Sequence, residues 1–140
     1  MTKKIFQGGL RLKSKKSFHS KIPKFSIITV VLNDKLGLKK TIRSVLKQKF
    51  HNFEYLIIDG GSTDGTLNLL KKYNSKIDYW VSKKDKGIWD AVNKGILLSK
   101  GKYINTINAG DTYHSKSSLT IINNYFEKDS DEATQTFPYR

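Results

Sequence analysis

The sequence contains no cysteine, and its three histidines are scattered along the chain. Without cysteine, neither a disulfide framework nor a thiolate metal site can form, and a reducing interior is compatible with the composition. A bound metal ion would therefore need oxygen ligands. Oxygen ligands favour Mg²⁺ or Mn²⁺ over Zn²⁺.

Long apolar runs are also missing. No stretch approaches the ~20 residues of a membrane span, and the amino terminus lacks the apolar core of a signal peptide. We therefore expect the protein on the cytoplasmic side of the membrane. The 140 residues, 37% of them hydrophobic, have the size of one domain and can bury about two thirds of the unfolded surface.

Acidic residues are scarce, and none precedes Asp34. The formal net charge is +14, and eight basic residues lie within residues 1–24, which we interpret as a flexible basic leader. The leader either attaches the protein peripherally to anionic lipid, at ~1 kcal/mol per basic residue, or is a solvated tail. Nucleic-acid binding is less favoured, because the charge gathers in the leader and no base-stacking motif accompanies it.

From Phe25 onward, strand and helix patterns alternate. We expect strands at 25–32, 53–58, 77–81 and 102–107 from their apolar and β-branched content. This order predicts an α/β fold with a mostly parallel sheet, right-handed crossovers and helices on both faces. The pattern disappears after Glu127, and residues 129–140 form an unpatterned tail. The inward residues of the four expected helices are Leu38, Ile42 and Val45; Leu67, Leu70 and Tyr73; Trp89, Val92 and Ile96; and Leu119, Ile122 and Phe126.

Several side chains have both a structural and a functional interpretation. Asp34 is expected to cap the first helix, whose basic side we interpret as a solvated surface rather than a phosphate site. Trp89 shares its stripe with other apolar residues, so we interpret it as core rather than as a sugar platform. Asp90 and Asn93 lie either on the helix surface or toward a cleft. Tyr113 is expected to pack over its loop.

Three polar loops follow strand ends, around Asn33, at Asp59–Ser62 and at Asn108–Asp111. Ligands of open α/β sheets bind at the carboxyl ends of the strands. The loops carry no dinucleotide or P-loop pattern, but they offer carboxylates and amides. Such groups suit hydrogen bonds to a base and ribose, and a hard cation held to a diphosphate. Asp59 can cap the next helix, yet its place at the strand end favours a ligand contact.

Five segments together resemble the amino-terminal half of the family 2 glycosyltransferases, above all the branch of bacterial polysaccharide and colanic-acid-type gene clusters. The resemblance runs from about residue 25 to 126, and the segments stand in the family's order. It implies a Rossmann-like GT-A nucleotide-binding half. The five segments are Ser26–Asn33, Thr41–Gln48, Glu54–Thr66, Asp85–Gly95 and Gly101–Asp111.

The resemblance also implies a nucleotide-diphosphate-sugar donor, usually UDP- or GDP-linked. Asp111 matches the family's metal motif and would hold Mg²⁺ or Mn²⁺. Two departures are visible: Gly60 stands where many members have a second acidic residue, and Asn108 and Gly110 stand where aspartates are common. The residues that match the family's donor contacts are Val31, Asn33, Asp59, Gly60, Asp85 and Asn108.

The implied reaction is sugar transfer to a polysaccharide or lipid-linked acceptor, with inversion at the anomeric carbon. No residue of this chain matches the family's general base, which we expect beyond Arg140. We therefore interpret residues 25–128 as the donor-binding domain of a truncated or frameshifted glycosyltransferase. The alternative is a non-catalytic nucleotide-sugar-binding module.

Overall fold

The computed structural model describes residues 4–13 and 21–133, with side chains up to residue 129. Its strands form one sheet in the order β1-β4-β3-β2-β5. The four strands β2 to β5 pair in parallel and β1 pairs antiparallel with β4, so the mostly parallel α/β fold is confirmed. The strands are β1 (Phe6–Gly8), β2 (Phe25–Val31), β3 (Phe53–Asp59), β4 (Tyr79–Ser82) and β5 (Tyr103–Thr106).

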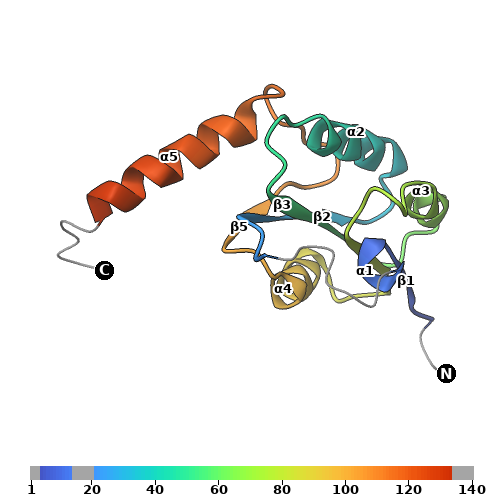
Figure 1. Ribbon diagram of the computed structural model, residues 1–140. Helices are drawn as coiled ribbons and strands as arrows, with labels where there is room; N and C mark the ends of the chain where they lie inside the picture. The colour runs from blue at the N-terminus through green and yellow to red at the C-terminus, as the bar shows by residue number, and fades with distance from the viewer. Residues whose placement is uncertain (1–3, 14–20, 134–140) are drawn as a thin grey trace.

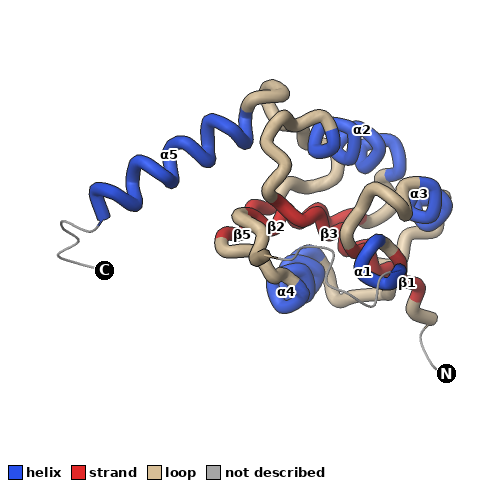
Figure 2. The backbone as a smooth tube through the Cα atoms, in the orientation of Figure 1, coloured by secondary structure: helices blue, strands red, loops and turns tan. Residues whose placement is uncertain are grey.

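Helices cover both faces of the sheet, as Figures 1 and 2 show, with α2 and α3 on one face and α4 on the other. Strands β2 and β3 are buried along almost their whole length. Alternate residues of these strands pack toward opposite helical layers, which explains why both strands are apolar without a polar face. The helices are α1 (Leu10–Lys13), α2 (Lys35–Leu46), α3 (Thr66–Lys72), α4 (Ile88–Leu98) and α5 (Ser118–Ala133).

Helix α4 packs on the sheet through small residues, and the expected stripe through Trp89 is wrong. Trp89 is 77% exposed and Ile96 is 42% exposed, whereas Ala91 and Gly95 are buried. A Cβ atom on Gly95 would lie 2.6 Å from a methyl carbon of Ile28. The helix therefore lies too close to the sheet for a bulky side chain at this position, and Val92 and Leu98 pack against the core beside it.

Residues 4–13 were expected in a flexible leader, but they form the sheet-edge strand β1 and the short helix α1. The Arg11 guanidinium donates 2.6 Å to the Glu54 carboxylate and 2.8 Å to the carbonyl of Leu98. Glu54 is 1% exposed, so an internal counter-charge is needed and Arg11 supplies it. Residues 1–3 and 14–20 of the expected leader lie outside the described part of the chain.

Helix α5 begins against the core and then extends away from it (Figure 1). Leu119 is buried, and the Phe126 ring stacks on Tyr103 with ring centroids 4.4 Å apart. The helix continues to Ala133, beyond the expected start of the tail at residue 129. Residues 134–140 lie outside the described part. Within the described part, no helix combines the length and apolarity that a membrane crossing requires.

The buried carboxylate of Glu54 gives a stability prediction. Arg11→Ala should lower the free energy of unfolding by about 3 kcal/mol, because it leaves a buried charge without its cationic partner. Urea unfolding at neutral pH measures this loss. The matched control is Lys13→Ala, which removes an exposed cation from the same short helix and should change stability by less than about 0.5 kcal/mol.

The same pair gives a pH dependence. Burial alone would raise the pKa of Glu54, but hydrogen bonds from Ser26, Lys100 and Arg11 and the charge of Arg11 together lower it below its ordinary value of 4.5. This stabilisation is present above pH 4.5 and is lost as the pH falls through the lower folded-state pKa. The difference between wild type and Arg11→Ala should therefore shrink in acid; a difference that is constant with pH would contradict the ion pair.

Candidate functional site

The parallel register brings the polar strand ends to one edge of the sheet. Val31 is paired with Asp59, Asp59 is paired with Ser82, and β5 runs parallel to β2 on its other side. The segments that follow β2, β3, β4 and β5 therefore leave the sheet at the same edge. This confirms the expectation that the loops after the first, second and fourth predicted strands converge.

The loops after β2 and β3 are fastened to each other around Asn33. The backbone of Asn33 is in the left-handed region, with φ of 51°, a conformation that asparagine tolerates better than most residues. The backbone amide of Asn33 donates a hydrogen bond of 2.7 Å to the Ser62 hydroxyl. The side-chain oxygen of Asn33 accepts a hydrogen bond of 2.7 Å from the backbone amide of Thr63. The Asn33 side chain thus shapes the edge of the site.

Asp59 lies beneath the site surface rather than in it. Its side chain is fully buried, and its carboxylate accepts hydrogen bonds from the hydroxyls of Ser62 and Ser82, the latter at 2.6 Å. The Ser62 amide also donates to it. Asp59 therefore ties the β3 loop to the end of β4. This is a structural role close to the capping role that we considered less favoured than ligand contact.

Helix α3 begins at Thr66 beside the same loop, and Asp64 organises its start. The Asp64 carboxylate accepts from the amide and hydroxyl of Thr66 and, at 2.9 Å, from the amide of Lys35. The hydrogen bond from the Thr66 hydroxyl is the main cause that lowers the pKa of this carboxyl. Asp64 therefore links the amino ends of α2 and α3.

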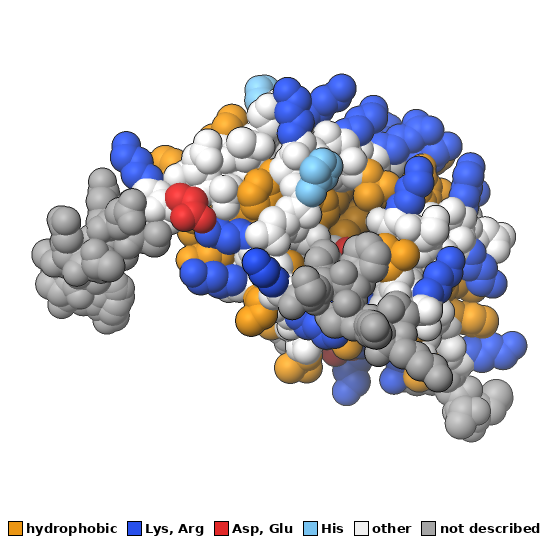
Figure 3. All heavy atoms as spheres, in the orientation of Figure 1, with side chains coloured by type: hydrophobic (Ala, Val, Ile, Leu, Met, Phe, Trp, Pro, Cys, Tyr) orange, Lys and Arg blue, Asp and Glu red, His pale blue; other side chains and the backbone are white. Residues whose placement is uncertain are grey.

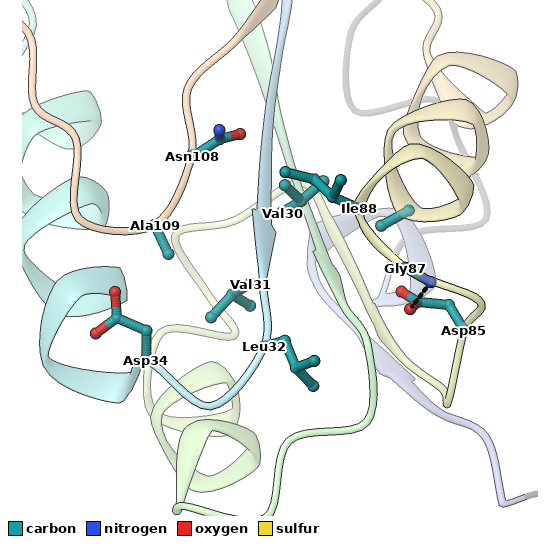
Figure 4. A pocket seen from close by; sticks show the side chains of 10 residues that line it. Val30, Val31, Leu32, Asp34, Asp85, Gly87, Ile88, Asn108 and Ala109 are labelled. Atoms are coloured by element: carbon teal, nitrogen blue, oxygen red, sulfur yellow. Dashed lines mark hydrogen bonds between the residues drawn. The ribbon is translucent and has the colours of Figure 1, made fainter.

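A pocket of about 290 Å³ opens at this edge of the sheet. Figure 4 shows the carboxylates of Asp34 and Asp85 on opposite sides of the end of β2, with apolar side chains between them. An apolar floor with few polar groups at its walls is the usual form of a small-molecule site. The lining residues are Val30, Val31, Leu32, Asp34, Asp85, Gly87, Ile88, Ala91, Asn108 and Ala109.

Asp85 occupies the space next to Gly60. Its carboxylate accepts a 3.0 Å bond from the Gly87 amide, and a Cβ atom on Gly60 would lie 2.8 Å from one of its oxygens. An acidic side chain at position 60 would therefore crowd and repel Asp85. Because Gly60 has no side chain, Asp85 can occupy this space. Asp85 is therefore the carboxylate on this wall of the pocket.

The opposite wall is a turn that Thr41 of α2 holds in place. The Thr41 hydroxyl donates 2.7 Å to the carbonyl of Asp111 and accepts 2.9 Å from the amide of Gly110. Gly110 has φ of 99°, which a residue with a side chain adopts only with strain. The turn closes with a 2.9 Å bond from the Asp111 amide to the carbonyl of Asn108. Helix α2 thus fixes the turn that carries Asn108 and Asp111.

Tyr113 packs against the core just beyond this turn, as expected. Its hydroxyl donates 2.6 Å to the side-chain oxygen of Asn105, and its amide donates to the Ser44 hydroxyl. Burial raises the pKa of the Tyr113 phenol, which therefore stays protonated as a hydrogen-bond donor.

The donor atoms near the turn fit a divalent cation only in part. The side chain of Asp111 is exposed, and Asp34 lies 3.5 Å from the position of a Cβ atom on Gly110. Across the described ranges, no three histidine, aspartate or glutamate side chains gather to form a metal site. A cation here would need most of its oxygen ligands from a bound anion such as a diphosphate.

The residues expected to contact a ligand therefore fall into two groups. Val31, Asp85 and Asn108 line the pocket. The other four, Asn33, Asp59, Gly60 and Asp111, shape its surroundings without lining it, and neither Asp90 nor Asn93 lines it either.

Sequence reasoning assigned Asp34 only to helix capping. Its carboxylate does accept from the Gly37 amide at 3.0 Å, but Asp34 also lines the pocket. The signal that could have found it is its position just after the first strand, at the edge where ligands bind.

Residues 26–140 match the protein family described as Glycosyl transferase family 2. An uncharacterized glycosyltransferase of Mycobacterium tuberculosis is 35% identical over 92 residues, which are 65% of this chain and 35% of that protein. A PGL/p-HBAD biosynthesis glycosyltransferase of Mycobacterium bovis is 31% identical over 103 residues, 71% of this chain and 40% of that protein. The chain thus spans well under half the length of these relatives.

Solved structures share the fold. Staphylococcus aureus TarS 1-349 in complex with UDP-GlcNAc aligns with a TM-score of 0.66 and 24% identity, over 75% of this chain and 31% of that one. The mannosyltransferase PcManGT of Pyrobaculum calidifontis, in complex with GDP-Man and Mn²⁺, aligns with a TM-score of 0.62 and 16% identity, over 71% of this chain and 31% of that one.

The Thr41 hydroxyl gives a prediction for the turn. Thr41→Val should cost about 1–3 kcal/mol, because it leaves the Gly110 amide and the Asp111 carbonyl without their partner. It should also accelerate hydrogen exchange at the Gly110 amide. Thr41→Ser keeps the hydroxyl and should preserve that protection. Equal Gly110 exchange in wild type and Thr41→Val would show that Thr41 does not hold the turn.

Proposed function

Because the chain belongs to glycosyl transferase family 2, we propose that the pocket between Asp34 and Asp85 binds the nucleotide of a nucleotide-diphosphate-sugar donor. The observation that carries this proposal is the pairing of an apolar floor with a carboxylate on each wall, at the carboxyl edge of a parallel sheet. A pocket of about 290 Å³ suits the nucleoside part of such a donor, with its diphosphate directed out toward the 108–111 turn.

Each wall has a different task in this proposal. The apolar side chains of Val31 and Ile88 contact the faces of the base, and Asp85 accepts hydrogen bonds from the base or ribose. Asn108 contributes an amide on the opposite wall. The loop around Asn33, Asp59 and Gly60 holds the end of the sheet in shape. Asp59 is buried and the Asn33 side chain is hydrogen-bonded to Thr63, which favours this structural role over direct contact with the donor.

A divalent cation completes the proposed donor site. Asp111 provides an exposed carboxylate, and the diphosphate oxygens and water provide the remaining ligands of Mg²⁺ or Mn²⁺. When bound, the cation offsets the negative charge that develops on the departing diphosphate. The complex of the structural relative PcManGT with GDP-Man and Mn²⁺ supports this cofactor class.

The proposed reaction is transfer of the sugar to a hydroxyl of a glycan or lipid-linked acceptor. The acceptor oxygen forms a bond to the anomeric carbon while the bond from that carbon to the diphosphate oxygen breaks, so the configuration inverts. The acceptor proton passes to a general base, which is the one group of this scheme that no described residue supplies in a matched position. Donor binding is therefore the part of the activity that these residues can perform.

Melting temperature measures donor binding directly. UDP or GDP with Mn²⁺, at about a hundred times its Kd, should raise the melting temperature by about 5–10 °C. Asp111→Ala should lose most of the increment that Mn²⁺ adds while it keeps the smaller shift from nucleotide alone. Asp129→Ala removes an exposed carboxylate from α5 and is the matched control. No nucleotide-dependent shift with any of UDP, GDP, ADP or CMP would contradict the proposal, and turnover of a nucleotide-sugar separates an active transferase from a binding module.

A further inference from the structure

The solvent side of helix α2 is rich in cationic side chains. Its buried side consists of Gly37, Leu38, Thr41, Ile42 and Val45, and the helix contains no acidic residue. Figure 3 shows Lys and Arg side chains gathered over α2. We call this surface the α2 basic face, and its basic residues are Lys35, Lys39, Lys40 and Arg43 of the helix and Lys47 at its C-cap.

The spacing of the cations on the α2 basic face destabilises the helix. Lys35, Lys39, Arg43 and Lys47 follow one another at intervals of four residues, so each cation faces the next along the helix surface. Among the residues that the structure describes, no ion pair with a basic residue of α2 is found. Like charges at this spacing destabilise a helix, and an anionic partner would remove that cost.

Two carboxylates lie at the amino end of this face, and both accept hydrogen bonds there. Asp34 accepts from the amide of Gly37, and Asp64 accepts from the amide of Lys35 and from Thr66. Neither one neutralises the middle or the carboxyl end of the helix, where Lys39, Arg43 and Lys47 lie. The α2 basic face therefore keeps its positive charge over most of its length.

A large apolar side chain projects from the same face. Leu36 is 76% exposed and lies one helical turn from Lys39 and Lys40. A leucine among cations can enter the boundary between lipid headgroups and acyl chains while the cations contact the headgroups.

The α2 basic face lies on the helix whose amino end borders the pocket. Asp34 lines the pocket and Lys35 begins the helix, so the amino end of α2 forms part of the pocket rim. Thr41 of the same helix holds the 108–111 turn. A surface that binds α2 from outside would therefore lie next to the mouth of the proposed donor site.

We propose that the α2 basic face docks the protein on an anionic lipid surface, with Leu36 inserted among the headgroups. The consequence for activity rests on the proposed donor site: docking presents its mouth to acceptors carried by the membrane. Binding to the lipid surface itself does not depend on that function. The site differs from the expected contact through the leader, because it lies on a helix packed on the core.

Lipid is favoured over nucleic acid by the composition of the face. Proteins that bind single strands pair their cations with aromatic side chains on which bases stack, and α2 contains no aromatic residue. An exposed leucine contributes little to contacts with phosphates on a duplex, whereas it gains free energy in the apolar boundary of a bilayer.

Vesicle co-sedimentation of the full chain tests the proposal. The protein should bind vesicles of phosphatidylcholine mixed with phosphatidylglycerol, and it should bind pure phosphatidylcholine vesicles far less. The variant K39Q/R43Q/K47Q should bind the anionic vesicles about a hundredfold more weakly, since each cation near an anionic surface contributes about a fivefold change in affinity. Its nucleotide-dependent melting shift should match that of wild type, which separates this test from the test of the donor site.

Two matched controls make the test specific. The variant K86Q/K94Q/K100Q removes the same charge in or next to α4, on the opposite face of the sheet, and should bind vesicles nearly as wild type does. Leu36→Gln should weaken vesicle binding several-fold, whereas Leu97→Gln, at a leucine 86% exposed on α4, should not. The α2 triple variant should melt no lower than wild type, because its helix loses like-charge repulsion.

Three results would overturn the proposal. One is vesicle binding by K39Q/R43Q/K47Q that equals wild type, since another segment would then hold the lipid. The second is an equal loss in K86Q/K94Q/K100Q, which would indicate attraction by net charge alone. The third is release of the protein from anionic vesicles by duplex RNA at equal phosphate concentration, which would assign the face to nucleic acid.

Discussion

Strand β3 carries a buried carboxylate at each end. The hydrogen-bond donors of these two carboxylates connect β3 to neighbouring strands and to the amino-terminal segment. At one end, Glu54 is 1% exposed and accepts from Ser26 of β2, from the amide of Lys100 and from Arg11 of the amino-terminal segment. At the other end, Asp59 is fully buried and gathers the β3 loop and the end of β4. A buried charge is tolerated only with such partners, so both ends of the central sheet are fixed by the same requirement.

The candidate site depends on this fixed edge. The loops that surround the pocket bind to one another through hydroxyl, amide and carboxylate side chains, of which Asn33 with Thr63 and Thr41 with Gly110 are the clearest cases. These hydrogen bonds fix the walls, which reduces the conformational entropy that ligand binding would cost. Helix α2 contributes to both the pocket and the proposed docking surface, since it holds one wall of the pocket and exposes the α2 basic face beside it.

Apolar patterning and strand-end polarity were enough to predict that strands β2 to β5 exist, that the sheet is mostly parallel and which edge carries the site. They failed on the side of α4 that meets the sheet: the small residues Ala91 and Gly95 are buried there, whereas Trp89 is exposed. They also failed where one distant hydrogen-bond partner determines the conformation of a segment or the burial of a side chain. The basic segment around Arg11 is ordered through Glu54, forty-three residues away, and the outward or inward position of Asp59 depends on Ser82 of another strand. No local pattern records such distant pairs.

A crystal structure of the chain with UDP or GDP and Mn²⁺ tests the central claim most directly. The account predicts the base on the apolar floor beside Val31 and Asp85, with the diphosphate and the cation at the turn that carries Asp111. A nucleotide held by the lysines of α2 or elsewhere outside the pocket, with the pocket between Asp34 and Asp85 empty, would contradict it.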